Sequence, residues 1–199
     1  MNFNIPPGTQ LLILANVTIY FVGRMTGTDL TYWFGLWPVG TDFETPFAVW
    51  QVMTYGFLHL DFGHLFFNMF AVFIFGPQIE MLYGQRWFLT YFLVCVFSAA
   101  VLQLIVGAVT NSLPIPTIGA SGGVFGLLLA FGMHFPRQRL MLIPIPIPVP
   151  AWLFVTGYGL LELFLGITGA ASNVAHFAHL GGMVGGYLMI RHRRGGRRR

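Results

Sequence analysis

The sequence predicts an all-α polytopic membrane protein, and three observations lead to this fold class. Of its 199 residues, 56% are apolar and only 8% are charged, about a third of the charged fraction of an ordinary soluble domain. The mean hydropathy is +0.72, and the apolar residues are gathered into long runs. These runs lack the strict alternation of a transmembrane β-strand, so we expect the membrane spans to be helices.

Six apolar runs predict six transmembrane helices, of which the fourth is short. Their expected bounds are about 9–22, 53–75, 87–106, 120–135, 151–168 and 174–190. Between the fourth and fifth spans, prolines alternate with aliphatic residues from Pro144 to Pro150, which predicts an extended connector rather than a helix. We therefore expect one membrane domain over residues 1–190, followed by a basic tail over residues 191–199.

The arginines predict the orientation of the chain in the membrane. All ten cations are arginines, and only Arg24 lies in a connector after an odd-numbered span. The other nine follow even-numbered spans: Arg86, Arg137, Arg139, Arg191, Arg193, Arg194, Arg197, Arg198 and Arg199. Because positive residues are retained on the cytoplasmic side, both termini are expected to be cytoplasmic.

The two ends of the chain suggest its location and partners. The start has no basic region before its first apolar run, so we expect a retained helix rather than a cleaved signal. Nothing resembles a transit peptide, which favours the cell membrane of a bacterium or archaeon. We expect the basic tail to meet anionic lipid headgroups and not nucleic acid.

With this orientation, the even-numbered spans all run inward from the outer face, so their first residues lie at similar depth. Polar side chains, which are costly in lipid, gather in this layer on three different helices. They are His59, His64 and Asn68 on the second span, Ser121 on the fourth, and His176 and His179 on the sixth. His64 and Asn68 are one helical turn apart and are expected to point the same way.

Pairs of glycines predict that the fourth and sixth spans touch. Gly122 and Gly126 form a small-xxx-small pair on the fourth span, and Gly182 and Gly186 form one on the sixth. Such pairs let two helix backbones approach closely. His179 shares a helical face with the second pair, so contact would bring it within reach of the serine on the fourth span.

Each of these residues also has a purely structural explanation. Intramembrane histidines can bond the carbonyl of a neighbouring helix, and small residues can serve packing alone. His59 is expected near the interface, and His176 either starts the sixth helix or supports His179. Glu162 is expected to be a protonated or hydrogen-bonded group facing the bundle, because no second acid lies at its depth. Cys95 is the only cysteine, and no spacing predicts a metal or other cofactor.

Three segments together resemble the rhomboid intramembrane serine proteases, over essentially the whole chain. They are the run from His59 to Asn68 (HLDFGHLFFN), Gly119 to Gly122 (GASG) and Ala178 to Gly182 (AHLGG), in this order on the second, fourth and sixth spans. The resemblance implies a rhomboid-like bundle of six helices and a Ser-His dyad without a carboxylate. Ser121 would be the nucleophile and His179 the general base. His64, Asn68 and the backbone N–H of Ser121 would form the oxyanion hole.

The resemblance also implies supporting residues and a substrate class. Its motifs contain His59, Gly119 and Gly122, and Phe125 stands where many members have a tyrosine; it can stack on the histidine but cannot donate a hydrogen bond. His176 would support the site from the start of the sixth span. The Trp-Arg pair of many members' first loop is missing, and Arg24 is the only cation there. The expected substrates are single-span membrane proteins.

Two other functions compete with proteolysis. A non-catalytic rhomboid-like protein for membrane binding or quality control would lack the serine or the histidine, and both are present here. A small transporter or channel would need paired intramembrane charges or broken helices, and only Glu162 answers that description. We therefore predict an intramembrane serine endopeptidase.

Overall fold

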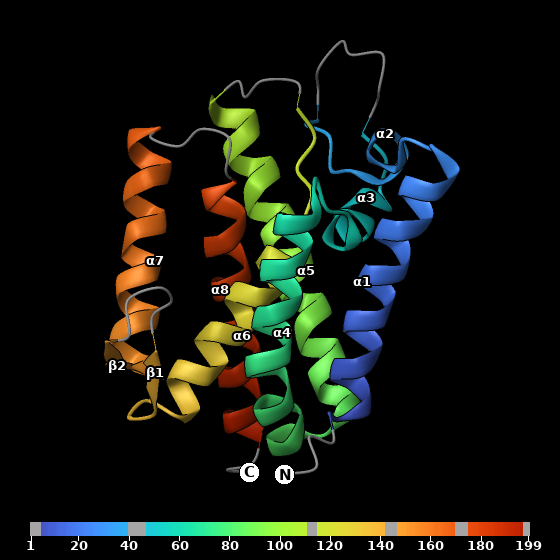
Figure 1. The fold of residues 1–199 in the computed structure, drawn as a ribbon. Coiled ribbons are helices and arrows are strands. Elements are labelled where there is room, and N and C mark those ends of the chain that lie inside the picture. The colour runs from blue at the N-terminus through green and yellow to red at the C-terminus, as the bar shows by residue number, and fades with distance from the viewer. Residues whose placement is uncertain (1–4, 40–46, 111–114, 142–146, 170–174, 197–199) are drawn as a thin grey trace.

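The computed structural model describes residues 5–39, 47–110, 115–141, 147–169 and 175–196, which form a bundle of helices (Figure 1). Its six main helices are α1 (Pro7–Thr26), α4 (Phe62–Tyr83), α5 (Gln85–Thr110), α6 (Ser121–His134), α7 (Ala151–Thr168) and α8 (His176–Gly196). Three short helices, α2 (Leu30–Phe34), α3 (Gln51–Thr54) and η1 (Tyr55–Phe57), lie between α1 and α4. Strands β1 (Arg139–Met141) and β2 (Pro148–Pro150) lie between α6 and α7.

Each of the six main helices overlaps one of the six predicted spans, with one clear error in bounds at the second. We predicted a span over residues 53–75, but the chain passes through α3 and η1 before α4 begins at Phe62. The reason is a helix cap: Asp61 is in an extended conformation, and its side chain accepts a hydrogen bond from the backbone N–H of His64 at 2.8 Å. His59 therefore precedes the helix, and α4 extends to Tyr83.

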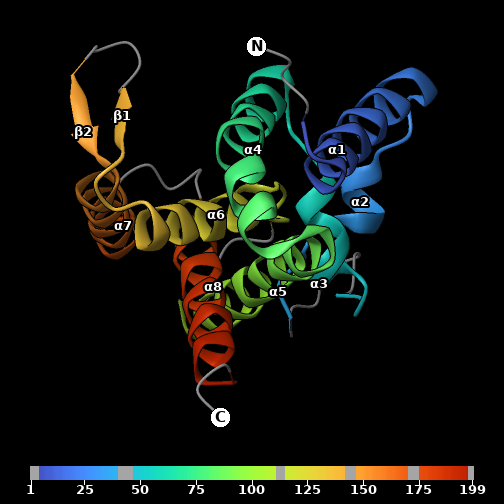
Figure 2. The same cartoon turned by 90° about the horizontal axis from the view of Figure 1, so that it is seen from below.

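The direction of the helices agrees with the predicted alternation. In Figure 1, α4, α6 and α8 run downward, while α1, α5 and α7 run upward. Helix α1 begins and α8 ends at the same end of the bundle. Seen from below, α7 stands at one edge beside α6 and α8, and α1 lies at the opposite edge beside α4 (Figure 2).

Among the described residues, three helices are long and apolar enough to cross a membrane: α4, α5 and α7. Helix α6 is also apolar but has only 14 residues. It lies between α4, α5, α7 and α8 and is buried along most of its length. A short buried helix can place its first residue inside the bundle, below the outer ends of its longer neighbours.

Glycines allow the close approach of α8 to α5 and α6. A Cβ on Gly182 would overlap the carbonyl oxygen of Gly122 on α6. A Cβ on Gly181 would lie 2.8 Å from the Cα of Ala99 on α5, closer than real Cβ contacts allow. The contact between the fourth and sixth predicted spans is therefore present, and both helices depend on small residues for it.

The proline-rich connector is extended where the structure describes it. Strand β2 pairs antiparallel with β1, and Leu140 stands opposite Val149. Residues 144–146 of the connector lie outside the described part of the chain, as do Arg197, Arg198 and Arg199 of the basic tail. The rest of the tail continues α8 as far as Gly196, so it extends the last helix of the membrane domain.

The amino end of α1 is fixed to the far end of α4. Its N-cap residue, Pro6, makes no side-chain cap. Instead the buried Glu80 accepts hydrogen bonds from the backbone N–H of Gly8 and of Thr9, each at 2.7 Å, and from the Thr9 hydroxyl at 2.8 Å. A carboxylate at this position satisfies free N–H groups and interacts favourably with the helix dipole.

Candidate active site

Ser121 is the first residue of the buried helix α6 and is itself half-buried. The chain enters this helix through Gly119, whose φ of +130° is a conformation that residues with a side chain rarely adopt. The backbone N–H of Gly119 donates to the carbonyl of the buried Tyr55 at 3.0 Å, which holds the turn in place. The serine hydroxyl thus stands at a helix N-terminus, where partial positive charge favours an anion.

His64 lies beside the same turn, in the first part of α4. A Cβ on Gly119 would stand 2.8 Å from Nε2 of His64 and 3.6 Å from Oγ of Ser121, so both atoms border one small volume. His64 is half-buried, and its backbone is fixed by the Asp61 cap. The structure therefore brings these two predicted site residues together from α4 and α6.

Asn68 is buried one turn further along α4. Its side-chain amide donates to the carbonyl oxygen of His64 at 2.9 Å. This bond uses one of the two N–H groups of the amide and leaves the second for another acceptor. His64 and Asn68 are thus on one face of α4, as their spacing predicts.

His179 is buried and lies against the face of α6 that carries Ser121. Its ring stacks on Phe125 with the centroids 4.2 Å apart and the planes 7° apart. Phe125 is four residues after Ser121, so the two side chains are neighbours on one helical face. The close contact between the backbones of Gly182 and Gly122 also holds this part of α8 against α6. The stacking that was expected of Phe125 is present.

His59 is buried beside the site, with only 8% of the residue exposed. Its ring meets that of His64 edge-on, with 5.0 Å between the centroids. His59 stands two residues before Asp61, the N-cap residue of α4, so it lies outside that helix. His59 thus packs beside the site without lying on a main helix.

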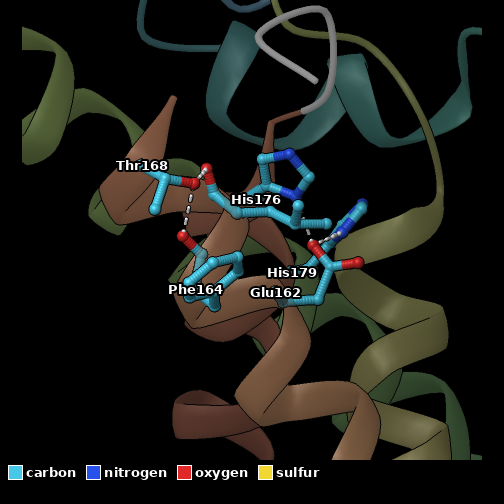
Figure 3. A network of polar contacts seen from close by, with 6 residues as sticks. Glu162, Phe164, Thr168, His176 and His179 are labelled. Carbon is cyan, nitrogen blue, oxygen red and sulfur yellow. Dashed lines mark hydrogen bonds and ion pairs between the residues drawn. The ribbon is translucent and has the colours of Figure 1, made fainter. Parts of the chain in front are cut away.

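The feature that sequence reasoning missed is a carboxylate at His179. Oε2 of Glu162, on α7, lies 2.8 Å from Nδ1 of His179 and 2.7 Å from Nδ1 of His176, the first residue of α8. Figure 3 shows both imidazoles converging on this carboxylate. Glu162 is hydrogen-bonded and faces the bundle, as the sequence predicts. The expectation of a site without a carboxylate differs from the structure, which has Glu162 beside His179. The sequence feature that could have indicated this contact is the lone acid within a membrane span.

Glu162, His176 and His179 also form the one group of possible metal ligands found among the described residues. Their donor atoms lie within 4.8 Å of one another, and two histidines with a carboxylate can bind zinc. Two ligands of a tetrahedral zinc ion stand about 3.3 Å apart, given bond lengths near 2.0 Å. The observed distances of 2.7 and 2.8 Å are those of hydrogen bonds.

Comparison with known proteins gives the family of this chain. The model of the rhomboid domain matches residues 46–194. The rhomboid protease GluP of Bacillus subtilis is 26% identical over 187 residues, covering 92% of this chain and 34% of GluP. RHOMBOID-like protein 12, mitochondrial, of Arabidopsis thaliana is 28% identical over 187 residues (86% of this chain, 54% of that protein). The rhomboid protease GlpG of Serratia proteamaculans is 27% identical over 178 residues (87% and 58%).

The matched region holds every candidate site residue, from His59 to His179. The chain spans a third to three fifths of the length of these three relatives, from 34% to 58%. The match to the family model and the apolar helices together show a multi-pass membrane protein. This chain belongs to the rhomboid family.

Proposed function

We propose that this chain is an intramembrane serine endopeptidase in which Ser121 is the nucleophile and His179 the general base. The observation that carries the proposal is the stacking of His179 on Phe125, one turn from Ser121 on the same face of α6. In support of the proposal, the stack holds the imidazole of His179 against the face of α6 that also carries the Ser121 hydroxyl. The names of GluP and GlpG, both rhomboid proteases, support the same chemistry.

The proposed reaction proceeds through an acyl-enzyme. Oγ of Ser121 attacks the carbonyl carbon of the scissile peptide bond, and Nε2 of His179 takes the hydroxyl proton. The tetrahedral intermediate then collapses: the C–N bond breaks, and His179 returns the proton to the leaving amine. Water attacks the ester in the second half of the reaction, its proton passes through His179 to Ser121, and the carboxylic acid product leaves.

The negative oxygen of the intermediate needs hydrogen-bond donors. We assign this role to the backbone N–H of Ser121 and to the side chains of His64 and Asn68. The supporting observation is that Nε2 of His64 and Oγ of Ser121 border one small volume beside Gly119. Gly119 keeps this space open, because a Cβ there would stand 2.8 Å from Nε2 of His64, whereas Gly122 has the different role of letting Ala99 of α5 pack closely against α6.

The proposed substrates are single-span membrane proteins, cut in or near the bilayer. Hydrolysis needs water, and the half-buried positions of Ser121 and His64 at the starts of their helices would let water reach them. We place the domain, residues 1–190, in a bacterial or archaeal cell membrane with both termini in the cytoplasm. The basic tail over residues 191–199 would contact anionic lipids.

The decisive test is Ser121→Ala in purified protein mixed with a single-span reporter. Cleavage should disappear while the variant stays folded and membrane-inserted, because only the nucleophile is lost. Ser98→Ala is the matched control, since it removes the hydroxyl of a described serine on α5 whose side chain faces Gly185 of α8, six residues after His179. A fluorophosphonate probe should label the wild type and Ser98→Ala, but neither Ser121→Ala nor His179→Ala.

Persistent cleavage by pure Ser121→Ala would refute the assignment of the nucleophile. Failure of the probe to label wild-type protein that is otherwise folded would indicate a non-catalytic member of the family. The orientation has its own test: a fluorescent protein fused after Arg199 should be cytoplasmic, and an externally added protease should leave it intact.

A further inference from the structure

We infer that Glu162 is a positioning residue for His179, so that this protein uses a Ser-His-carboxylate arrangement built across three helices; the inference rests on the function proposed above. The arrangement combines Ser121 on α6, His179 on α8 and Glu162 on α7. In it the carboxylate never touches the substrate. It acts by holding the general base in one tautomer and one orientation.

Glu162 lies on the buried side of its helix. Only three residues of α7 are buried, namely Ala151, Val155 and Glu162. The remaining side chains of this peripheral helix include a row of exposed apolar residues, among them Leu160, Leu161 and Phe164. A carboxylate on such a helix would be costly unless its partners lie in the bundle. Glu162 is 3% exposed and points at α8, where both partners lie.

The contact between Glu162 and His179 bears on which ring nitrogen of the histidine carries the proton. An ionised carboxylate can only accept hydrogen bonds, so the nitrogen that faces it must carry a proton. In the proposed arrangement Glu162 is ionised, so Nδ1 of His179, which lies 2.8 Å from its Oε2, carries the proton. The neutral ring then has its lone pair at Nε2, the nitrogen that must take the proton of Ser121. The same negative charge stabilises the imidazolium that forms during the reaction.

His176 contacts the same carboxylate oxygen of Glu162 as His179 does. Its Nδ1 lies 2.7 Å from Oε2 of Glu162, and its ring lies nearly perpendicular to that of His179 at 6.4 Å between centroids. Two donors on one oxygen fix the carboxylate more firmly than one, and they offset its burial. His176 therefore holds Glu162, and Glu162 holds His179. Glu162 contacts the edge of the His179 ring at Nδ1, while a face of the ring stacks on Phe125.

Four variants separate positioning from mere structural support. Glu162→Leu removes the charge and both acceptors, whereas Glu162→Gln keeps the shape and an acceptor oxygen but loses the charge. Glu162→Asp is the conservative variant with the charge restored on a shorter side chain. Leu161→Ala, on the exposed side of α7, is the matched control. Each is purified and assayed for kcat and KM on a single-span reporter, with circular dichroism and thermal unfolding as checks on the fold.

The expected effect lies on kcat and not on KM. Glu162→Gln should lower kcat about 10-fold, because the negative charge beside the general base is lost. Glu162→Leu should lower kcat on the order of 100-fold, because the acceptor that orients the general base is lost as well. Glu162→Asp should recover part of the loss, and Leu161→Ala should match the wild type. Equal activity of Glu162→Leu and the wild type would overturn the inference. So would a loss in Glu162→Leu that appears only as a lowered unfolding temperature or a raised KM.

A second readout does not depend on turnover. Protein with ¹⁵N-labelled histidine, in the inactive Ser121→Ala background, should show His179 as the Nδ1–H tautomer in long-range ¹H–¹⁵N correlation spectra. The His179 signals are assigned by their loss in His179→Ala. Glu162→Leu should convert this single tautomer into a mixture. An Nε2–H tautomer in the presence of Glu162 would overturn the inference, even if every variant were inactive.

The outcomes also separate this inference from the proposed function. If wild-type protein neither cleaves the reporter nor reacts with the fluorophosphonate probe, the proposed function fails, and the tautomer measurement still decides the role of Glu162. If wild type cleaves, Ser121 is labelled and Glu162→Leu keeps full kcat, only the present inference fails. Loss of wild-type activity on treatment with EDTA, restored by Zn²⁺, would assign the three side chains to a metal and overturn it as well.

Discussion

The backbones of Gly122 and Gly182 touch, because a Cβ on Gly182 would overlap the carbonyl oxygen of Gly122. Gly122 follows Ser121 directly, and Gly182 lies one turn after His179. The closest approach of α6 and α8 is therefore beside the two residues that we propose for catalysis. Any side chain at this contact must separate the helices, and the hydroxyl would move away from the imidazole.

Gly182→Ala should therefore abolish most of the activity without removing a reacting group. A displacement of about 1 Å at a catalytic pair can cost about 100-fold in rate. Gly157→Ala is the control, since a Cβ at Gly157 meets nothing within 4 Å and alanine favours the helix. The measurement is kcat on a single-span reporter for both variants. Full activity of Gly182→Ala would show that the distance between α6 and α8 does not set the geometry of the site.

Phe125 should contribute to the rate through the ring of His179. Stacked pairs are worth roughly 0.5–1.5 kcal/mol beyond simple burial, so Phe125→Leu should lower kcat about 2- to 10-fold. Phe125→Tyr keeps the ring and should stay within about twofold of the wild type. Tyr158 also meets Phe125, with 4.9 Å between centroids, so Tyr158→Leu provides a comparison in which the stacked pair itself is intact. A Phe125→Leu enzyme as fast as the wild type would mean that the stack has no part in placing the base.

The sequence predicts the arrangement of the main helices well because the bilayer restricts the possibilities. Long apolar runs must be helices, and successive spans must cross the bilayer in alternating directions. Pairs of glycines then show which of these helices can pack closely together. The shared direction of three spans then predicts a similar depth in the bilayer for Ser121, His64 and His179, without any knowledge of side-chain positions. Helix α7 has the bounds that its apolar run predicts, from Ala151 to Thr168.

What the sequence could not show depends on contacts between distant residues. The start of α4 is set by one capping bond from Asp61, which a hydropathy pattern does not detect. The partners of Glu162 lie on another helix, 14 and 17 residues away, beyond any periodicity within α7. A lone acid in an apolar run shows that a partner is needed, but only the packing of α7 on α8 shows which one.

Glu80 should be the acid whose loss most weakens the fold without touching the site. It accepts three hydrogen bonds from Gly8 and Thr9 and joins the start of α1 to α4. Glu80→Gln keeps one acceptor oxygen but turns an amide N–H₂ toward backbone donors, which should cost about 1–3 kcal/mol. We expect a lower midpoint of thermal unfolding in detergent, with the initial rate of reporter cleavage unchanged at low temperature.

Asp29→Asn is the matched control for this substitution, because Asp29 caps the short helix α2 with an exposed carboxylate. Both variants exchange an acid for its amide at a helix start, but only Glu80 is buried and bridges two long helices. Asp29→Asn should therefore change the unfolding midpoint much less, since exposed caps typically contribute about 1 kcal/mol or less and water can replace the carboxylate. If the two variants lost stability equally, the buried bridge between α1 and α4 would have no special part in the fold. If Glu80→Gln slowed cleavage at a temperature where it is fully folded, the far end of the bundle would be coupled to the site through α4, which carries both Glu80 and His64.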